Sequence, residues 1–187
     1  MPLTPFHFTS GLFFGTILRK FLSLPIFLIG TVLPDVEPAV IILLHWGKPY
    51  LSYPHHGIVH SFLVGIISAI LIALIFNHWQ EKIGEWIKFF ERRKSFLVVF
   101  FSSLLGYWLH ILFDSLMHYD VFPFWPLKIN PFLRLITFNQ QYFLISILSV
   151  IGFILFAINF YQSKNQIYDP RRSSKSHQTK RQKWKQY

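Results

Sequence analysis

Three long apolar runs constrain this chain more than any other feature of its sequence. They cover residues 61–76, 95–113 and 143–161. Each run approaches the ~20 residues that an α-helix needs to cross a ~30 Å hydrocarbon layer. Backbone N–H and C=O groups have no water partner in lipid, which favours helices for runs of this length. The sequence therefore predicts an all-α, multi-pass membrane protein.

The composition excludes most other classes of protein. Apolar residues make up 52% of the 187 residues and charged residues only 14%, about half of the roughly 25% that is usual for globular proteins. The 22 Phe, 6 Trp and 8 Tyr leave too little polar surface for a soluble monomer. The chain has no Cys, which excludes a disulfide-stapled secreted domain.

The first 46 residues contain shorter apolar pieces, at 8–18, 21–33 and 36–46. Arg19-Lys20, Pro34-Asp35 and Pro38 interrupt them. Such pieces suit discontinuous or half-inserted helices, which are tolerated where protein or water covers the broken backbone. Together with the three long runs, they predict about four to five membrane-inserted helices.

Basic residues gather in segments that flank the apolar runs. Residues 80–94 have apolar side chains at helical spacing with Glu and Lys on the other face, which predicts an amphipathic helix on the membrane surface. Residues 164–187 hold eight Lys or Arg against Asp169 alone. We therefore expect a helical membrane domain over residues 1–163 and a basic, disordered cytoplasmic tail over residues 164–187.

The same basic residues predict the orientation in the membrane. Fifteen of them belong to residues 19–20, 80–94 and the tail, whereas only Lys48, Lys128 and Arg134 lie elsewhere. The positive-inside rule then places the C-terminus in the cytoplasm and residues 46–58 and 118–137 outside. A multi-pass protein of the plasma (inner) membrane is expected. Since no basic patch lies on a foldable segment outside the membrane, nucleic acid is not an expected partner.

Several ionisable residues lie in or beside the apolar runs: His7, Asp35, Glu37, His55, His56, His60, His110, Asp114, His118 and Asp120. Such groups cost several kcal/mol in a membrane segment unless they find a partner, and they usually mark a functional site. His110, Asp114 and His118 recur every four residues and would share one face of a helix. Each residue alone also has a plain structural interpretation, such as a helix-tying hydrogen bond, an interface histidine or a helix cap.

The predicted topology brings these residues to one leaflet, on the outer side. We expect His7, Asp35, His55, His56, His60, His110 and Asp114 to form a shared metal site there. Imidazole and carboxylate ligands suit Zn²⁺ best, with Mn²⁺ or Fe as alternatives, rather than a thiolate or all-oxygen site. No Gly-x-Ser-x-Gly, P-loop or Gly-x-Gly-x-x-Gly pattern points to other chemistry.

Four motifs resemble those of a known family. They are Thr-x-x-His at Thr4 to His7, Leu33-Pro34-Asp35, the stretch His55 to Ser61 (His-x-Gly-x-x-His-Ser), and His-x-x-x-Asp at His110 and Asp114. This pattern, over roughly residues 1–130, resembles the inner-membrane-associated metal-dependent hydrolases, also named LexA-binding membrane proteins. Its order is similar to that of the all-α zinc-dependent phospholipase C and single-strand nuclease group, which hydrolyse phosphoesters.

The chain also departs from these patterns. The later His and His-x-x-x-Glu that complete the metal cluster of the soluble enzymes are missing, apart from a contribution by His118. Position 56 is His where many relatives have Arg, so either His55 or His56 is the candidate ligand.

These observations predict a membrane-bound, metal-dependent hydrolase. Its substrate would be a phosphoester or a lipid-derived molecule at the outer leaflet, among membrane lipids. Asp35 or Asp114 would ligate the metal or accept a proton as the catalytic carboxylate. The alternative is a non-catalytic membrane protein, either a metal-binding transport component or an assembly factor, in which the His and Asp residues are structural.

The segment from Asp120 to Leu127 follows these residues directly. Its two prolines disfavour a regular helix, and its aromatic residues suit the headgroup level of a membrane. We expect it to lie along the outer interface, either as a lip for a lipid substrate or as an aromatic anchor.

Overall fold

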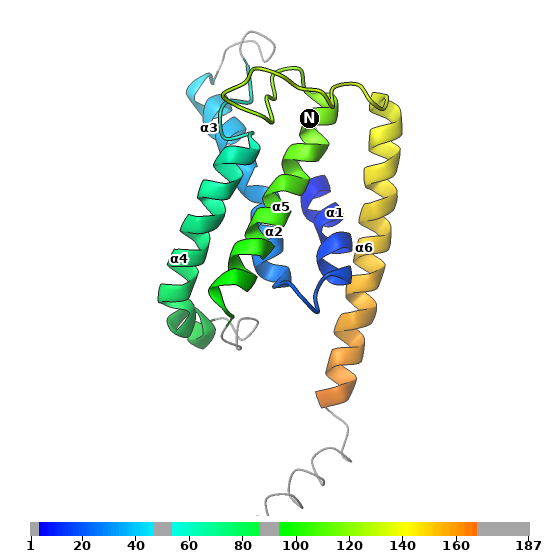
Figure 1. The fold of residues 1–187 in the computed structure, drawn as a ribbon. Coiled ribbons are helices and arrows are strands. Elements are labelled where there is room, and N and C mark those ends of the chain that lie inside the picture. The colour runs from blue at the N-terminus through cyan, green and yellow to red at the C-terminus, as the bar shows by residue number, and fades with distance from the viewer. Residues whose placement is uncertain (1–3, 47–53, 87–93, 168–187) are drawn as a thin grey trace, which may run out of the picture.

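A computed structural model of the chain describes residues 4–46, 54–86 and 94–167. The regular elements in these ranges are all helical (Figure 1): α1 (Thr4–Ile17), α2 (Leu24–Val32), the 3-10 turn η1 (Leu33–Asp35), α3 (Val36–Leu44), α4 (Phe62–Trp86), α5 (Phe96–Met117) and α6 (Phe138–Ile167). The predicted all-α fold is confirmed.

Four segments among the described residues are long and apolar enough to cross a membrane. They are Leu24–Leu44, Phe62–Trp79, Phe96–Met117 and Phe138–Gln162. Helix α1 has only 14 residues, which is short of the ~20 that a full crossing needs. The structure thus agrees with a multi-pass protein that has four spans and one shorter inserted helix.

The second and third N-terminal pieces form one span rather than two separate elements. The turn η1 joins α2 to α3, and the N–H of Val36 reaches back to the carbonyls of Leu33 and Pro34. Pro34 has no N–H, so it interrupts the regular hydrogen-bond ladder at this point. The tighter turn keeps the chain helical across the interruption and leaves Asp35 inside the span.

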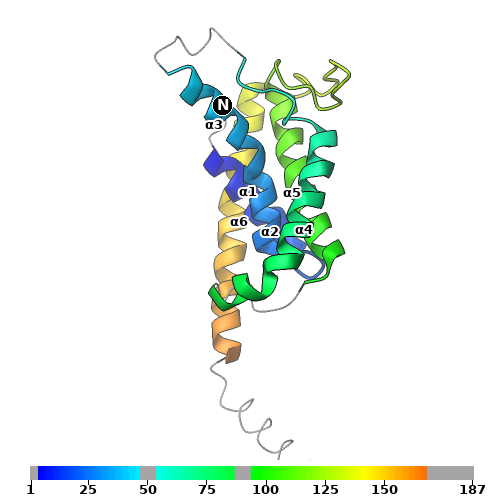
Figure 2. The same cartoon turned by 90° about the vertical axis from the view of Figure 1, so that its left-hand side faces the viewer.

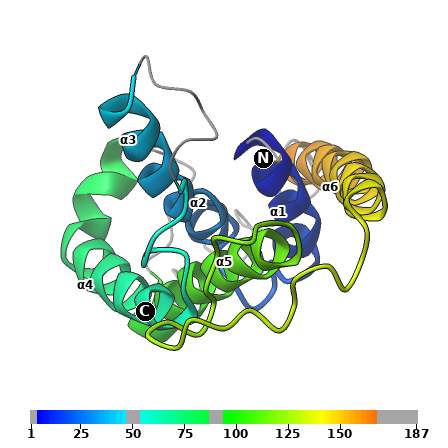
Figure 3. The same cartoon turned by 90° about the horizontal axis from the view of Figure 1, so that it is seen from above.

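Helix α5 lies at the centre of the bundle, against α2 and α4, while α1 packs between α2 and α6 (Figure 3). Glycines let the backbones of α2 and α5 touch, because a Cβ on Gly30 would meet the carbonyl of Ser103 and one on Gly106 that of Phe27. Small residues of this kind allow close packing in membrane helices, where no hydrophobic force holds the helices together. This crossing fixes where the residues of α5 that follow Gly106 lie relative to α2.

The polar residues gather at one end of the bundle, here called the upper end. The start of α1, the end of α3, the start of α4 and residues 118–137 lie at this end (Figure 1). Residues 18–23, the end of α4, the start of α5 and the end of α6 lie at the other, lower end. The cytoplasmic assignment of the lower end stays a prediction.

The structure describes only part of the predicted surface helix (residues 80–94) and of the predicted tail (residues 164–187). Residues 80–86 continue α4, and the last turns of this helix bend sideways from its axis (Figure 2). Residues 87–93 of the predicted surface helix, and residues 168–187 of the predicted tail, lie outside the described residues. Residues 118–137 contain turns and no regular helix, and this confirms the expectation for Asp120 to Leu127.

Candidate metal centre

The centre is built around Asp114, which is buried one turn from the upper end of α5. His110 lies one turn before it, and its Nε2 is 3.0 Å from Asp114 Oδ2. The other ring nitrogen of His110, Nδ1, donates to the carbonyl of Thr31 at 2.8 Å. The close crossing of α2 and α5 makes this bond possible, and the bond fixes the orientation of the imidazole.

The turn η1 brings a second carboxylate to the same place. Asp35 Oδ1 lies 3.7 Å from His110 Nε2, and its Oδ2 is buried without a hydrogen-bond partner among the described residues. The interruption at Pro34, visible in the sequence, is thus what delivers Asp35 to the bundle interior.

Glu37 of α3 orients His60, the last histidine before α4. The imidazole Nδ1 of His60 donates to Glu37 Oε2 at 2.9 Å. The backbone N–H groups of Gly57 and Val59 donate to the same carboxylate at 2.8 and 3.3 Å. His60 is fully buried, and its Nε2 lies 3.6 Å from Asp114 Oδ2.

Asp120, in the loop after α5, orients His56 in the same way. Its Oδ1 accepts from His56 Nδ1 at 3.0 Å, and its Oδ2 accepts the backbone N–H groups of His55 and His56 at 2.9 and 3.1 Å. Burial would raise the pKa of Asp120, but the His56 ring and these N–H groups outweigh it and hold the pKa below its usual range. His56 Nε2 then lies 3.8 Å from Asp114 Oδ2.

His7 completes the group from the first turns of α1. Its Nε2 lies 3.1 Å from Asp114 Oδ1, and its ring centroid is 4.1 Å from that of His110. The packing of α1 against α2 places it there. One carboxylate therefore has four imidazoles around it, from α1, α5 and the loop before α4.

The hydrogen bonds within this group leave its inner atoms unsatisfied. Nδ1 of His56, His60 and His110 is already a donor to Asp120, Glu37 and Thr31. In a neutral imidazole the other nitrogen is then a bare acceptor. These Nε2 atoms face Asp114, which is an acceptor as well, so acceptors meet acceptors in a buried space. A cation at this point would satisfy both.

The spacing of these atoms suits a divalent metal. Ligands bound at ~2.0–2.2 Å lie roughly 3.0–3.5 Å from one another in octahedral or tetrahedral geometry. Three of the contacts to Asp114 are 3.0, 3.1 and 3.6 Å. Asp35, His60, His110 and Asp114 each offer a ligand atom, all within 4.8 Å of one another.

The protonation of the histidines outside the spans also suits metal binding. Burial lowers the pKa of His60 and lowers that of His118 to about 4. Both imidazoles are therefore neutral at pH 7, the form that a metal requires.

His118 adds a second group beside the first. Its ring centroid is 4.6 Å from that of His56, and its Nε2 is buried without a hydrogen-bond partner among the described residues. Ligand atoms of His56, His118 and Asp120 lie within 4.8 Å of one another. Because both oxygens of Asp120 already accept N–H groups, we assign this carboxylate to orienting His56 rather than to ligating a metal.

The structure brings together six of the seven predicted ligands. His7, Asp35, His56, His60, His110 and Asp114 meet at the centre. Of the two adjacent histidines that the sequence left open, His56 faces Asp114, while the backbone N–H of His55 binds Asp120. His55 belongs to neither group of closely spaced ligand atoms in the described part of the chain.

The orienting roles of three groups were not predicted from the sequence: Glu37, Asp120 and the Thr31 carbonyl. The spacing carried a signal for two of them, because each carboxylate lies two residues after another polar group of the centre, Asp35 or His118. The Thr31 carbonyl carries no side-chain signal, and only the helix crossing reveals it.

The family described as YdjM inner membrane protein matches residues 1–172, so the chain belongs to this family. The match extends past the motifs and includes α6. Neither the curated proteins nor the solved structures contain a match to the chain.

Proposed function

We propose that this inner-membrane family member is a metal-dependent hydrolase whose substrate is a phosphoester or a lipid-derived molecule. The observation that carries the proposal is the set of imidazoles that direct an Nε2 at Asp114 while a separate acceptor holds their Nδ1–H. Outer acceptors that fix the tautomer and orientation of histidines are a regular feature of metal sites. A helix-tying hydrogen bond would need only one such histidine.

His60, His110 and Asp114 would hold the metal, with His7 and His56 completing the ligand set and Asp35 beside it. Zn²⁺ fits this donor set best, and Mn²⁺ and Fe fit it as well. Such a metal polarises a phosphoryl or carbonyl oxygen and lowers the pKa of a bound water. The similarity in motif order to zinc-dependent phospholipase C and single-strand nucleases supports phosphoester chemistry.

Asp35 is the residue best placed to accept a proton. One of its oxygens faces His110, and the other is buried without a hydrogen-bond partner among the described residues. Asp114 is surrounded by imidazoles on both oxygens, so its role is to bind. We therefore assign proton transfer to Asp35 and metal binding to Asp114.

The test begins with metal analysis of the purified full-length protein. We expect Zn, Mn or Fe near one equivalent or above, and hydrolysis of a water-soluble nitrophenyl phosphodiester that stops on chelation and returns with metal. Asp35→Asn should retain metal and lose turnover. A bound metal without hydrolysis of phosphodiester or phospholipid would favour the metal-binding transport component. A protein without metal would refute the hydrolase and favour an assembly factor in which the His and Asp residues are structural.

The upper end, with the centre, is proposed to face the outer side of the membrane. The support is the excess of basic residues in segments that flank the lower end. A reporter fused after Tyr187 should be cytoplasmic. A reporter that is active only outside would place the centre on the inner leaflet.

A further inference from the structure

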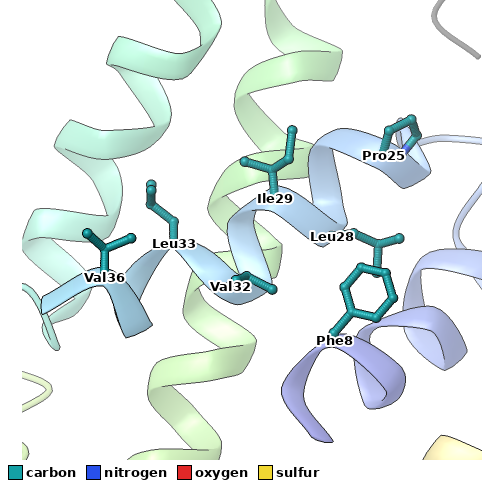
Figure 4. Close-up of a pocket in the computed structure, with 7 residues that line it drawn as sticks. All are labelled: Phe8, Pro25, Leu28, Ile29, Val32, Leu33 and Val36. Atoms are coloured by element: carbon teal, nitrogen blue, oxygen red, sulfur yellow. The ribbon is translucent and has the colours of Figure 1, made fainter. Parts of the chain in front are cut away.

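An apolar groove runs along α2 beside α1 (Figure 4). Phe8 of α1 forms one wall, and residues between Pro25 and Val36 form the other. Every side chain that lines it is hydrocarbon, and its volume is about 580 Å³. Cavities that bind small ligands measure ~300–1,000 Å³. The groove therefore has the size of a ligand site and offers no polar side chain to its occupant.

The upper end of the groove adjoins the Asp114 centre. Phe8 follows His7 in α1, and Leu33 and Val36 flank the segment that contains Asp35. The same short turn thus presents hydrocarbon to the groove and a carboxylate to the centre. A molecule in the groove would have one end beside the proposed metal.

The length of the groove corresponds to one leaflet. From Pro25 to Val36 a helix rises roughly 16 Å at ~1.5 Å per residue, and half of a ~30 Å hydrocarbon layer is roughly 15 Å. The packing of α2 against α5 gives a similar depth. Ser102 Oγ on α5 accepts the N–H of Ser23, the residue just before α2, at 2.8 Å. Ser102 lies three helical turns below Asp114. The groove therefore extends from the centre toward the middle of the membrane.

A second hollow, of about 460 Å³, adjoins the groove at Leu33 and Val36 and lies between α3, α4 and α5. It differs in chemistry, because Glu37, Ser68 and Tyr107 contribute to its lining. A hydrocarbon chain would bury these polar groups at a cost. The groove beside α1 is therefore the better place for an apolar occupant.

We propose that this groove binds one acyl chain of a membrane phospholipid whose headgroup lies at the Asp114 centre. The proposal rests on the proposed function and narrows its substrate class to a lipid taken from the leaflet at the upper end. The continuity of an apolar groove with a cluster of cation ligands matches a molecule that has a hydrocarbon chain and a phosphate or ester group at its end.

Photolabelling tests the proposal without any need for turnover. The full-length protein is placed in phospholipid nanodiscs that contain a phospholipid with a diazirine in one acyl chain, and labelled peptides are mapped after irradiation. We expect the label to concentrate on the peptides of α1 and α2. Ile29→Trp fills the groove and should reduce that labelling about tenfold, because a filled cavity excludes its occupant.

Ile154→Trp is the matched control. Ile154 lies on α6 and is 50% exposed, close to the 45% of Ile29. This substitution should leave the labelling of α1 and α2 unchanged. Equal labelling of α6 and α2, or a groove that cross-links instead to a second copy of the chain, would overturn the proposal.

A kinetic comparison separates this inference from the proposed function. If Ile29→Trp lowers phospholipid hydrolysis while metal content and hydrolysis of the water-soluble phosphodiester stay at the wild-type level, the groove selects lipids. If the enzyme hydrolyses the soluble probe and Ile29→Trp leaves phospholipid turnover unchanged, the acyl-chain site is refuted while the hydrolase stands. Labelling confined to the groove in a protein that binds no metal would refute the hydrolase and retain the lipid site.

Discussion

Four carboxylates lie at the upper end of the bundle, and they form two pairs with different surroundings. Asp35 and Asp114, the inner pair, face the bare Nε2 atoms of histidines and receive no backbone N–H in the contacts described above. Glu37 and Asp120, the outer pair, each accept one imidazole N–H and two backbone N–H groups. In the proposed metal centre, the inner carboxylates would face the cation and the outer ones would hold its ligands, so the role of a carboxylate depends on which donors it already accepts.

The two outer carboxylates, Glu37 and Asp120, both accept hydrogen bonds from the loop before α4, residues 55–60. Glu37 holds residues 57–60 from α3, and Asp120 holds residues 55–56 from the loop after α5. Two histidines of one short loop are thus aimed at the same point by elements far apart in the sequence. A loop without these contacts would have to order its imidazoles when the metal binds, at a cost in conformational entropy.

The largest effect is expected from the inner pair. Asp114→Asn should weaken metal binding by more than about 100-fold, beyond the 10–100-fold typical of outer groups, because it removes the charge that all four imidazoles face. Metal content by elemental analysis and the metal-dependent rise in Tm both measure this loss. His78→Ala, at the lower end, is the control and should change neither. An Asp114→Asn protein with full metal content would assign Asp114 to packing.

The location of the inner pair was predictable from the sequence, and the physical reason is the membrane. A charge in an apolar run is expensive, so Asp35 and Asp114 stood out as functional candidates without any knowledge of the fold. The helical spacing of His110 and Asp114 then placed both on one face of α5. The convergence on one end followed from the expected topology.

The outer pair and the choice between His55 and His56 could not be predicted in the same way. Asp120, His55 and His56 lie in irregular segments, where periodicity says nothing about side-chain direction, and so does His60, the partner of Glu37. Asp120 accepts the Nδ1–H of the His56 imidazole and the backbone N–H of His55. The close backbone approach of α2 and α5 at Gly30 and Gly106, which brings the Thr31 carbonyl to His110, likewise depends on how the two helices cross. The sequence predicted α2 and α3 as separate pieces, because Pro34 normally ends a helix and the 3-10 turn that joins them has no clear sequence pattern.

Glu37→Gln should have the next largest effect, a loss in metal affinity of about 10–100-fold. The amide keeps one acceptor oxygen, loses the negative charge and presents an NH₂ where an N–H donor now points, so it should hold the His60 imidazole less firmly. The unsatisfied donors should also lower the free energy of unfolding by about 1–3 kcal/mol. Competition with a metal-chelating dye and thermal unfolding measure the two effects. Unchanged affinity would show that His60 does not need Glu37 to bind metal.

Asp120→Asn should follow with a smaller loss, near the lower, about 10-fold end of the same range. His56 Nε2 is 3.8 Å from Asp114, farther than the 3.6 Å of His60 Nε2, and His56 is outside the group formed by Asp35, His60, His110 and Asp114. The same dye competition, run in parallel with Glu37→Gln, ranks the two outer carboxylates. If Asp120→Asn instead matches Asp114→Asn, then Asp120 is itself a ligand, together with His56 and His118.

The smallest effect on metal affinity is expected from removal of the His55 side chain. His55→Ala keeps the backbone N–H that Asp120 accepts, so metal affinity should change by less than about threefold. His56→Ala is the matched substitution one residue away, and it removes both the Nε2 that faces Asp114 and the Nδ1–H that Asp120 accepts. It should weaken binding at least as much as Asp120→Asn. Elemental analysis and dye competition on the two alanine variants measure the difference. Equal losses at positions 55 and 56 would mean that the loop as a whole, rather than one oriented imidazole, supports the centre.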